Sequence, residues 1–451
     1  AVALLAQLGL MDAYSSKFTY AYFQVPCSAA GVEGVAVRVV YPAQPRYEEG
    51  APVIVYVQGG IGEGFFSWLD EDYDPRGIVW VEFLFPGGRF EEWRSGGTYD
   101  YRGEACLEAL YAVLQFAQGR LASLDGRYID EAVDYPLLTG EVGMYASSYG
   151  GTLAGLVFAK YGGEGLENVK YVVFYESPPC SFYATTDLGR VGDDPEPLVD
   201  ADGDGIPWND YRNPNYQPRS ASEDGCIIDF SSLRYHPDVG LYLDNDGDGQ
   251  PTYVVVDGRR VTDVDGSGAI EEDEDYILPY WRLAKWGKRV YSRLVMEAVE
   301  ELGLASQLSD EYLSPSEAYE FWEWRELAGH FDEIASSAPW LRCMVISLRK
   351  QHVTAAPDYG NTVVLYNALK ARGLWVRLNP DAAYLAHVLG RPVECSDLDA
   401  LAEVSYDNVA SCVITDEEVN FNSQKRKLVE VTAVLEMADR VHYDRWDPNL
   451  D

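Results

Sequence analysis

The sequence predicts an α/β protein with a mostly parallel central sheet, helices on both faces of that sheet and an inserted acidic segment. Short apolar runs alternate with helical patterns over residues 1–176. An acidic, glycine-rich segment over residues 177–280 interrupts this texture, which returns over residues 341–390. Repeated alternation of strand and helix is typical of a parallel sheet covered on both sides.

The first part of the chain contains the clearest strand signals. Strands are expected at residues 18–25, 35–41, 52–57, 77–85 and 169–175, and a helix is expected at 105–117. The first two strands suggest a β-ribbon that enters the sheet. The next two are continuously apolar, which indicates strands buried on both faces.

The later part of the chain is expected to complete the core. Helical patterns at 281–302 and 314–331 predict a helical cap or connection over residues 281–340, and the core resumes with a strand at 343–348, a helix at 362–371 and a strand at 374–378. Residues 391–451 then form a C-terminal extension. Within it, residues 429–436 alternate partly like a strand, which could pair with a neighbouring copy at an exposed edge.

The composition limits the classes of partner. The 451 residues carry a formal net charge of −38, which argues against nucleic acid and anionic membrane surfaces because both would be repelled. No apolar run is long enough to span a membrane. The acidic excess is compatible with adaptation to high salt or to high temperature, and its carboxylates are also cation ligands. The chain opens on Ala1-Val2-Ala3, which is compatible with a processed mature end and equally with an artificial start of the sequence.

The seven cysteines contain no C-x-x-C pair, so a zinc or redox motif is not expected. Cys180 with Cys226, and Cys395 with Cys412, are candidate disulfides if the compartment is oxidising. The alternative is that these residues are unpaired small hydrophobes. Cys106 and Cys343 lie within apolar patterns and are expected in the core.

Ser148 is the candidate nucleophile. An apolar run at residues 142–145 leads into Ala146-Ser147-Ser148-Tyr149-Gly150, and a helical pattern of small residues follows. This order predicts a strand, a sharp turn and a helix with one serine at the apex of the turn. Small residues two before and two after that serine permit the close packing that the turn needs, and the serine hydroxyl is lifted to where a base can reach it.

Residues 263–274 fit a 12-residue EF-hand loop. The expected calcium ligands are Asp263, Asp265, Ser267, the backbone of Ala269, and Glu274. A glycine stands at position 6 of the loop, where a sharp turn is needed, and an isoleucine at position 8. The sequence therefore predicts a calcium site here.

Two half-motifs precede the complete loop and share its first six positions. Their expected ligands are Asp200, Asp202, Asp204 and Asp210 in the first, and Asp244, Asp246 and Asp248 in the second, which Asp257 could complete. Up to three Ca²⁺ ions are therefore expected in the insertion. Because a cation neutralises carboxylates that repel one another, its binding energy contributes to folding. A structural role is expected rather than signalling, since no motif has helices on both sides.

These motifs together make the chain resemble the α/β-hydrolase superfamily of serine esterases, lipases and peptidases, over about residues 35–176 and 340–390. The resemblance implies an α/β-hydrolase fold and hydrolysis of an ester or amide through an acyl-enzyme on Ser148. It also implies an oxyanion hole made by the backbone N–H of Tyr149 and one from Gly59 or Gly60. Gln58 stands where the family often has a histidine.

The resemblance places the catalytic base after the last core strand. Of the five histidines, His387 fits this position best, although it could equally pack within an ordinary helix. The acid is expected after residues 343–348, where Gln351 stands instead of a carboxylate. Asp358 is the next carboxylate along the chain and is the candidate acid.

The leading hypothesis is a secreted, calcium-stabilised serine hydrolase for a small-molecule or peptide substrate, with an ester weakly favoured. Aromatic residues would either shape an apolar substrate cleft or belong to the core: Trp208, Trp281, Trp286, Trp322 and Trp324. One alternative is a catalytically inactive surface or structural protein that binds calcium and self-assembles. Another is a calcium-dependent binding module, such as a carbohydrate binder.

Overall fold

The structure of the chain, a computed structural model, describes thirteen segments of the sequence. These are residues 19–66, 76–163, 165–181, 213–218, 226–256, 258–267, 270–348, 360–381, 385–386, 403–405, 408–409, 414 and 424–446. Among these residues, no helix is both long and apolar enough to cross a membrane.

An eight-stranded sheet forms the centre of the molecule, in the order β1-β2-β4-β3-β7-β8-β18-β19. The strands are β1 (Thr19–Cys27), β2 (Gly31–Tyr41), β3 (Ala51–Val57), β4 (Val79–Phe83), β7 (Leu137–Ser147), β8 (Val169–Tyr175), β18 (Arg342–Ile346) and β19 (Trp375–Leu378). Strand β2 pairs antiparallel with both β1 and β4, and the other pairs are parallel. The predicted α/β-hydrolase fold is confirmed.

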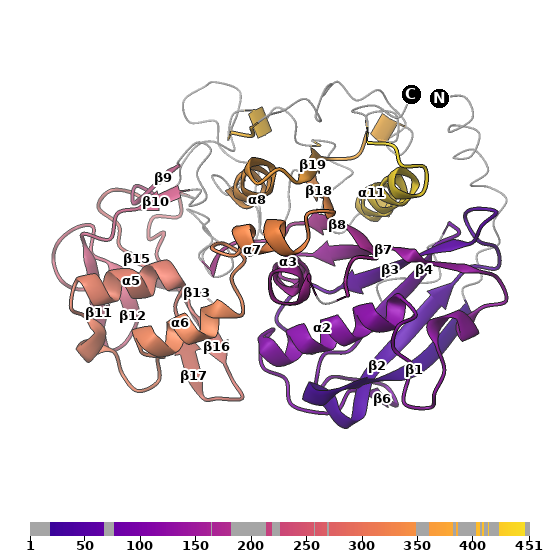
Figure 1. Cartoon of the computed structure of the whole chain (residues 1–451). Helices are drawn as coiled ribbons and strands as arrows, with labels where there is room; N and C mark the ends of the chain where they lie inside the picture. The colour runs from indigo at the N-terminus through magenta and orange to yellow at the C-terminus, as the bar shows by residue number, and fades with distance from the viewer. Residues whose placement is uncertain are drawn as a thin grey trace.

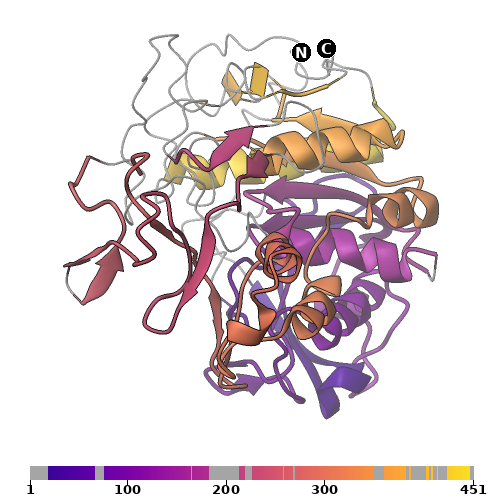
Figure 2. The same ribbon diagram turned by 90° about the vertical axis from the view of Figure 1, so that its left-hand side faces the viewer.

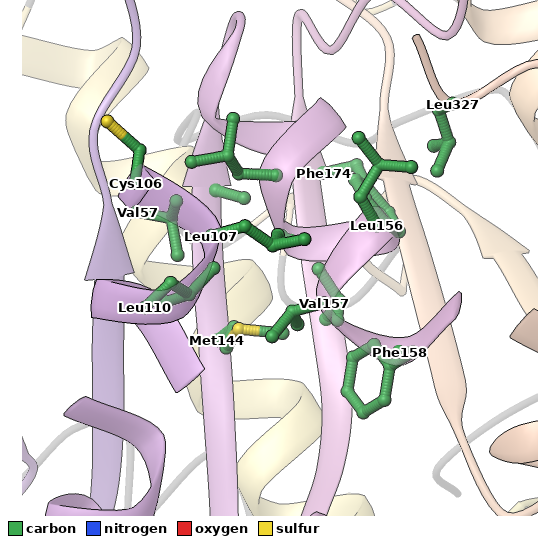
Figure 3. Packing of buried hydrophobic residues seen from close by; sticks show 14 of the residues in the cluster. Val57, Cys106, Leu107, Leu110, Met144, Leu156, Val157, Phe158, Phe174 and Leu327 are labelled. Carbon is green, nitrogen blue, oxygen red and sulfur yellow. The ribbon is translucent and has the colours of Figure 1, made fainter. Parts of the chain in front are cut away.

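One face of the sheet is covered by four helices. These are α2 (Glu104–Ala117), α3 (Gly150–Tyr161), α7 (Phe331–Ser337) and α8 (Gly360–Ala371). Figure 3 shows the packing from close by: Leu107 and Leu110 of α2 lie near Val57 of β3, and Val157 of α3 lies near Met144 of β7. The parallel strands are apolar on both faces, and this helical layer covers one face only, so a second layer must cover the other.

The long C-terminal helix α11 (Gln424–His442) covers the opposite face of the sheet (Figure 1). It packs against Tyr145 of β7, Tyr171 of β8 and Met344 of β18. The expectation of an edge strand at residues 429–436 is therefore wrong. All residues from 429 to 440 are buried, including Glu430 and Glu436.

The reason for this error lies in the two buried glutamates. Glu430 pairs with Arg426, and Glu436 pairs with Arg440, each four residues apart on the helix. Counting both glutamates as outward-facing produced an apparent alternation of polar and apolar residues. Charged side chains on a helix can be buried in the protein interior when they are paired, so the period of two had no structural meaning.

The described residues of the insertion form mainly short hairpins. Its strands are β9 (Tyr216–Pro218), β10 (Cys226–Ile228), β11 (Leu233–His236), β12 (Gly240–Leu243), β13 (Val254–Val256), β14 (Arg259–Val261), β15 (Tyr276–Ile277), β16 (Trp281–Leu283) and β17 (Lys288–Val290). Figures 1 and 2 show these hairpins gathered beside the sheet, together with α5 (Arg293–Glu301) and α6 (Pro315–Glu323). A further hairpin, β5 (Arg89–Phe90) with β6 (Trp93–Arg94), lies between β4 and α2.

The helix expected at residues 281–302 forms only in its second half. Residues 281–290 make the β16–β17 hairpin instead, and α5 begins at Arg293 after an N-cap in which Ser292 Oγ accepts from Val295 N. Gly287, with φ +63°, supplies the left-handed residue that the hairpin turn needs. That turn was the signal that the sequence reading overlooked.

The cysteines form no disulfide among the described residues. Cys27, Cys106 and Cys343 are buried thiols, as expected for the last two. The side chain of Cys226 and both residues of the Cys395–Cys412 pair lie outside the described residues. The two disulfides therefore stay predictions.

Candidate active site and acidic clusters

Ser148 lies at the apex of a sharp turn between β7 and α3. Its φ of +47° places it in the left-handed region, which costs a non-glycine residue about 1–2 kcal/mol. Two backbone hydrogen bonds hold the turn: Ser148 N donates to Tyr175 O at 2.6 Å, and Gly151 N donates to Ser148 O at 2.9 Å. Such strain persists where the surroundings impose it, and it is concentrated at functional sites.

Glycines allow α3 to pack directly on its neighbours at this turn. A Cβ on Gly150 would lie 2.2 Å from the carbonyl oxygen of Val57, and one on Gly151 would lie 1.9 Å from Ser177 Oγ. The smallness required two residues after the serine thus has a concrete cause, which is the close approach of β3 to the start of α3.

The loop after β3 lies directly against the nucleophile. Gln58, which is fully buried, braces this loop, because its Nε2 donates to Phe65 O and Phe83 O and its Oε1 accepts from Phe65 N, at 2.7 to 3.0 Å. A Cβ on Gly59 would lie 2.9 Å from Ser148 Cβ. Gln58 therefore acts as a structural bracket for the loop.

The two candidate glycines of this loop differ in what their N–H groups do. Gly59 N donates to Ser147 Oγ at 3.1 Å, and Ser147 Oγ also lies 3.1 Å from the hydroxyl of Tyr56. Gly60 is exposed, with φ +67°, and a Cβ there would meet nothing within 4 Å. The N–H of Gly59 is thus engaged inside the protein.

Tyr149 follows the nucleophile and stands at the N-terminus of α3. Backbone N–H groups at a helix N-terminus have no acceptor within the helix and favour negative charge. The side chain of Tyr149 is buried, which raises the pKa of its phenol well above the ordinary value, and its hydroxyl donates to Arg325 O at 2.6 Å. The side chain of Tyr149 therefore connects the turn at Ser148 to the segment after α6.

A row of contacting aromatic side chains, here called the aromatic wall, extends from the turn at Ser148 into the insertion. Trp281 lies edge-on to Tyr149 with ring centroids 5.0 Å apart, and it also contacts Trp322 at 5.1 Å. At the far end of the wall, Trp286 contacts Tyr101 at 5.3 Å and is 45% exposed, whereas Trp322 is fully buried. The predicted aromatic residues are thus divided between core and surface. Trp208 lies outside the described residues.

The candidate base and acid, His387 and Asp358, lie outside the described residues, as does Gln351. Three other histidines make contacts in other parts of the fold. His236 Nδ1 accepts from Asp238 N in the turn after β11, His330 precedes α7 with its pKa lowered by burial, and His442 stacks on Tyr47 at the end of α11.

Glu176 is a buried carboxylate near the turn at Ser148 that was not predicted from the sequence. It directly follows β8, next to the strand that carries Ser148, with φ +52° and 3% exposure. Its Oε1 accepts a hydrogen bond from the hydroxyl of Tyr175 at 2.8 Å. Its position at the carboxyl end of a predicted parallel strand was the available signal, because ligands and catalytic groups gather at that edge of an α/β sheet.

Two buried acidic clusters in the insertion could hold metal ions. The first unites Asp263, Asp265 and Glu274, with their carboxylate oxygens within 4.8 Å of one another. These are three of the ligands expected in the complete loop. Ser267 lies beside them, with its N–H donating to Asp263 Oδ1 at 3.0 Å, and Ala269 lies outside the described residues.

The second cluster unites Asp244 and Asp246 with Asp275, a residue that the sequence reading did not select. Asp275 is fully buried; its pKa is raised by burial and, further, by the like charges of Asp246 and Asp244. Asp248, the third expected ligand, instead accepts from Gln250 N at 2.7 Å. Because Glu274 and Asp275 are consecutive, one turn supplies a carboxylate to each cluster.

The first half-motif cannot be compared in the same way. Its four expected ligands, Asp200, Asp202, Asp204 and Asp210, all lie outside the described residues, as does Asp257. The donor set of both described clusters is made of carboxylate oxygens, which suit hard divalent cations. Each cluster brings two buried carboxylates and one exposed carboxylate together, which is costly without a cation, so both clusters fit a metal ion.

Comparison with known proteins places the chain among similar solved structures only distantly. No family model matches the sequence, and no curated protein matches it. Vibralactone cyclase is similar over 98% of this chain and 87% of its own, with 12% identity and a TM-score of 0.38. An esterase of Pyrobaculum calidifontis is similar over 99% and 91%, with 12% identity and a TM-score of 0.37.

A thermophilic carboxylesterase cloned from a metagenomic library gives the same picture. It covers 97% of this chain and 95% of its own, with 14% identity and a TM-score of 0.35. At such values the similarities carry no argument about activity. The assignment to the α/β-hydrolase fold rests on the strand order, the pairing directions and the turn at Ser148.

Proposed function

We propose that the chain is a serine hydrolase that cleaves an ester or amide through an acyl-enzyme on Ser148. One observation carries this proposal: Ser148 occupies a strained left-handed position between β7 and α3, with the loop of Gly59 and Gly60 packed against it. A strained nucleophile turn beside a loop of glycine N–H groups is the arrangement that acyl transfer requires.

The proposed reaction uses the residues as follows. Ser148 Oγ attacks the carbonyl carbon while His387 takes the hydroxyl proton and Asp358 orients His387. The oxyanion accepts hydrogen bonds from backbone N–H groups, and its collapse releases an alcohol or amine that takes the proton from His387. Water then attacks the acyl-enzyme with the same base, which releases the acid and restores Ser148.

We further propose Ca²⁺ as the ion of both acidic clusters, in a structural role. The support is the all-carboxylate donor set and the spacing of residues 263–274, which follows a calcium loop. In this role the ion neutralises buried carboxylates and fastens the hairpins beside the sheet. Secretion remains part of this proposal, because structural calcium sites occur in extracellular modules.

The alternative of a non-catalytic, self-assembling protein has lost its main structural support. Its assembly edge was residues 429–436, which belong to α11 and are buried against the sheet. Calcium binding by itself is equally compatible with a hydrolase. The hydrolase therefore remains the function that the site supports best.

Labelling with a fluorophosphonate probe, followed by peptide mapping, tests the proposed function. A single adduct on Ser148 is expected, and Ser148→Ala should abolish it. Ser147→Ala is the matched control, because the neighbouring hydroxyl is already bonded to Gly59 N and Tyr56 and should not be the labelled group. Absence of any adduct on folded, calcium-loaded protein would refute the assignment.

A further inference from the structure

Arg102 is a buried arginine without a carboxylate partner among the described residues. Its side chain is fully buried and lies 3.7 Å from the centroid of the Phe85 ring. It donates from Nη2 to Gly59 O at 2.9 Å, while Nε and Nη1 have no hydrogen-bond partner in the part of the chain that the structure describes. Burying an arginine without a carboxylate partner costs free energy, so such a residue is a candidate for a functional role.

The backbone that carries Arg102 is strained. Tyr101 and Arg102 both have positive φ, at +60° and +66°, which is rare for two consecutive non-glycine residues. The turn is held by Arg325, whose Nε donates to Tyr101 O at 2.8 Å, and by Asp100, whose carboxylate accepts from Gly103 N and Ala105 N at the start of α2. The protein thus maintains an unfavourable conformation that directs Arg102 inward.

The bond from Arg102 fixes the orientation of one peptide unit. Gly59 C=O and Gly60 N–H belong to the same planar trans peptide, so they point in opposite directions. Arg102 donates to the Gly59 carbonyl from the buried side of this peptide. The Gly60 N–H therefore points toward the exposed side. Gly60 is exposed and has open space around its Cα, so a substrate oxygen can approach this N–H.

The neighbouring contacts hold the same loop on both sides of that peptide. Gly59 N donates inward to Ser147 Oγ, and the hydroxyl of Tyr99 donates to Ile61 O. Because Gly59 N–H is already used, the loop has the N–H of Gly60 to offer at the nucleophile. The bond of Gly59 N to Ser147 Oγ therefore separates the two candidate donors that the sequence could not distinguish.

We propose that Arg102 is a positioning residue that orients and polarises the Gly59–Gly60 peptide, so that Gly60 N–H and Tyr149 N–H form the oxyanion hole. A guanidinium that bonds to the carbonyl strengthens the N–H of the same peptide as a donor, since hydrogen bonds in a chain polarise one another. Its buried charge also stabilises an oxyanion that forms at this loop. This inference rests on the proposed function.

The test compares Arg102→Met, Arg102→Gln and Arg102→Lys with wild type. Two rates are measured on folded protein: turnover of p-nitrophenyl acetate, as kcat and KM, and phosphonylation of Ser148 by the fluorophosphonate. We expect kcat and phosphonylation to fall by roughly 10- to 100-fold in Arg102→Met with little change in KM, because the interaction forms in the transition state. Lys and Gln, which can still donate to Gly59 O, should recover part of both rates, with Lys ahead because it keeps the charge.

Arg440→Met is the matched control for loss of a buried arginine. Arg440 is fully buried on α11 and pairs with Glu436, away from the loop. Arg440→Met should lower the free energy of unfolding and leave turnover and phosphonylation per folded molecule unchanged. If Arg102→Met does not fold, the Gln and Lys variants carry the test.

The outcomes separate the two proposals. If wild type is labelled on Ser148 and the Arg102 variants react within twofold of it, the Arg102 inference is wrong and the hydrolase stands. If the variants lose rate only through a raised KM or in parallel with unfolding, Arg102 is merely structural and the inference is also overturned. If folded wild type is neither labelled nor active, both proposals fail.

Discussion

Replacing Asp439 with asparagine should destabilise the protein strongly, because this residue ties α11 to the core. Asp439 accepts three hydrogen bonds at 2.7 Å each, from Arg46 Nε, from Arg46 Nη2 and from the hydroxyl of Tyr47. The side chains of Arg46 and Asp439 are 16% and 5% exposed. Asparagine keeps the shape but presents an N–H group to a guanidinium and removes the negative charge.

The expected magnitude follows from burial. Removing one partner of a buried ion pair typically costs about 3–5 kcal/mol, because the other charge stays buried without compensation. Glu33 and Arg94 offer a control pair with an N–O distance of 2.6 Å, but their side chains are 44% and 56% exposed. Glu33→Gln should therefore cost less than about 1 kcal/mol.

Equilibrium urea unfolding at fixed calcium measures both changes, with tryptophan fluorescence and circular dichroism as independent probes. The free energy of unfolding of Asp439→Asn should fall by about 3 kcal/mol or more at an unchanged m-value. Arg46→Met should cost less in the Asp439→Asn background than in wild type, because the pair is already broken there. If Asp439→Asn costs no more than Glu33→Gln, the Arg46–Asp439 pair does not tie α11 to the core and the reasoning fails.

Three further predictions follow from other regions of the molecule. Gly143→Ala should cost about 1–3 kcal/mol in urea unfolding, because its Cβ would lie 2.2 Å from the Tyr171 ring, whereas Gly163→Ala, with nothing within 4 Å, should be near neutral; equal effects would contradict the packing. Burial raises the pKa of Glu326 from 4.5 to about 7, so the folded state keeps a proton that the unfolded chain loses in this window. Stability should therefore fall as pH rises from 4.5 to 7 and level off above it, and Glu326→Gln should remove up to about 3 kcal/mol of that dependence, seen as the wild-type-minus-variant difference across pH. Chelation with EGTA should lower the melting temperature, Ca²⁺ but not Mg²⁺ should restore it, and Asp263→Asn should weaken the restoration; a melting temperature indifferent to all three would exclude a structural calcium role.

Much of the core could be predicted from the sequence because its signals are local. Buried parallel strands are continuous apolar runs, and the one expected at 169–175 matches β8. The turn at Ser148 was also readable, since the strand, the small residues and the helix are contiguous. The same holds for Asp263, Asp265 and Glu274, whose spacing in one loop brings them together.

Errors arose where tertiary packing buries a charged side chain or completes a cluster. The polar residues of α11 are satisfied inside the protein, so their polarity did not mark a surface. Asp275 joins Asp244 and Asp246 only because β12 and β15 pair, which no local pattern reveals. In both cases the packing of the folded chain, and not the local pattern, decides where the charged side chain lies.

The sequence alone therefore determined the α/β core, the candidate nucleophile and the loop of the first acidic cluster, because each depends on residues within one turn or one strand. Only the tertiary structure shows that Arg102 donates to Gly59 O across 43 positions of the chain. It also decided that the C-terminal segment is a core helix. Such features depend on which buried charges meet, and that is settled by packing, not by local pattern.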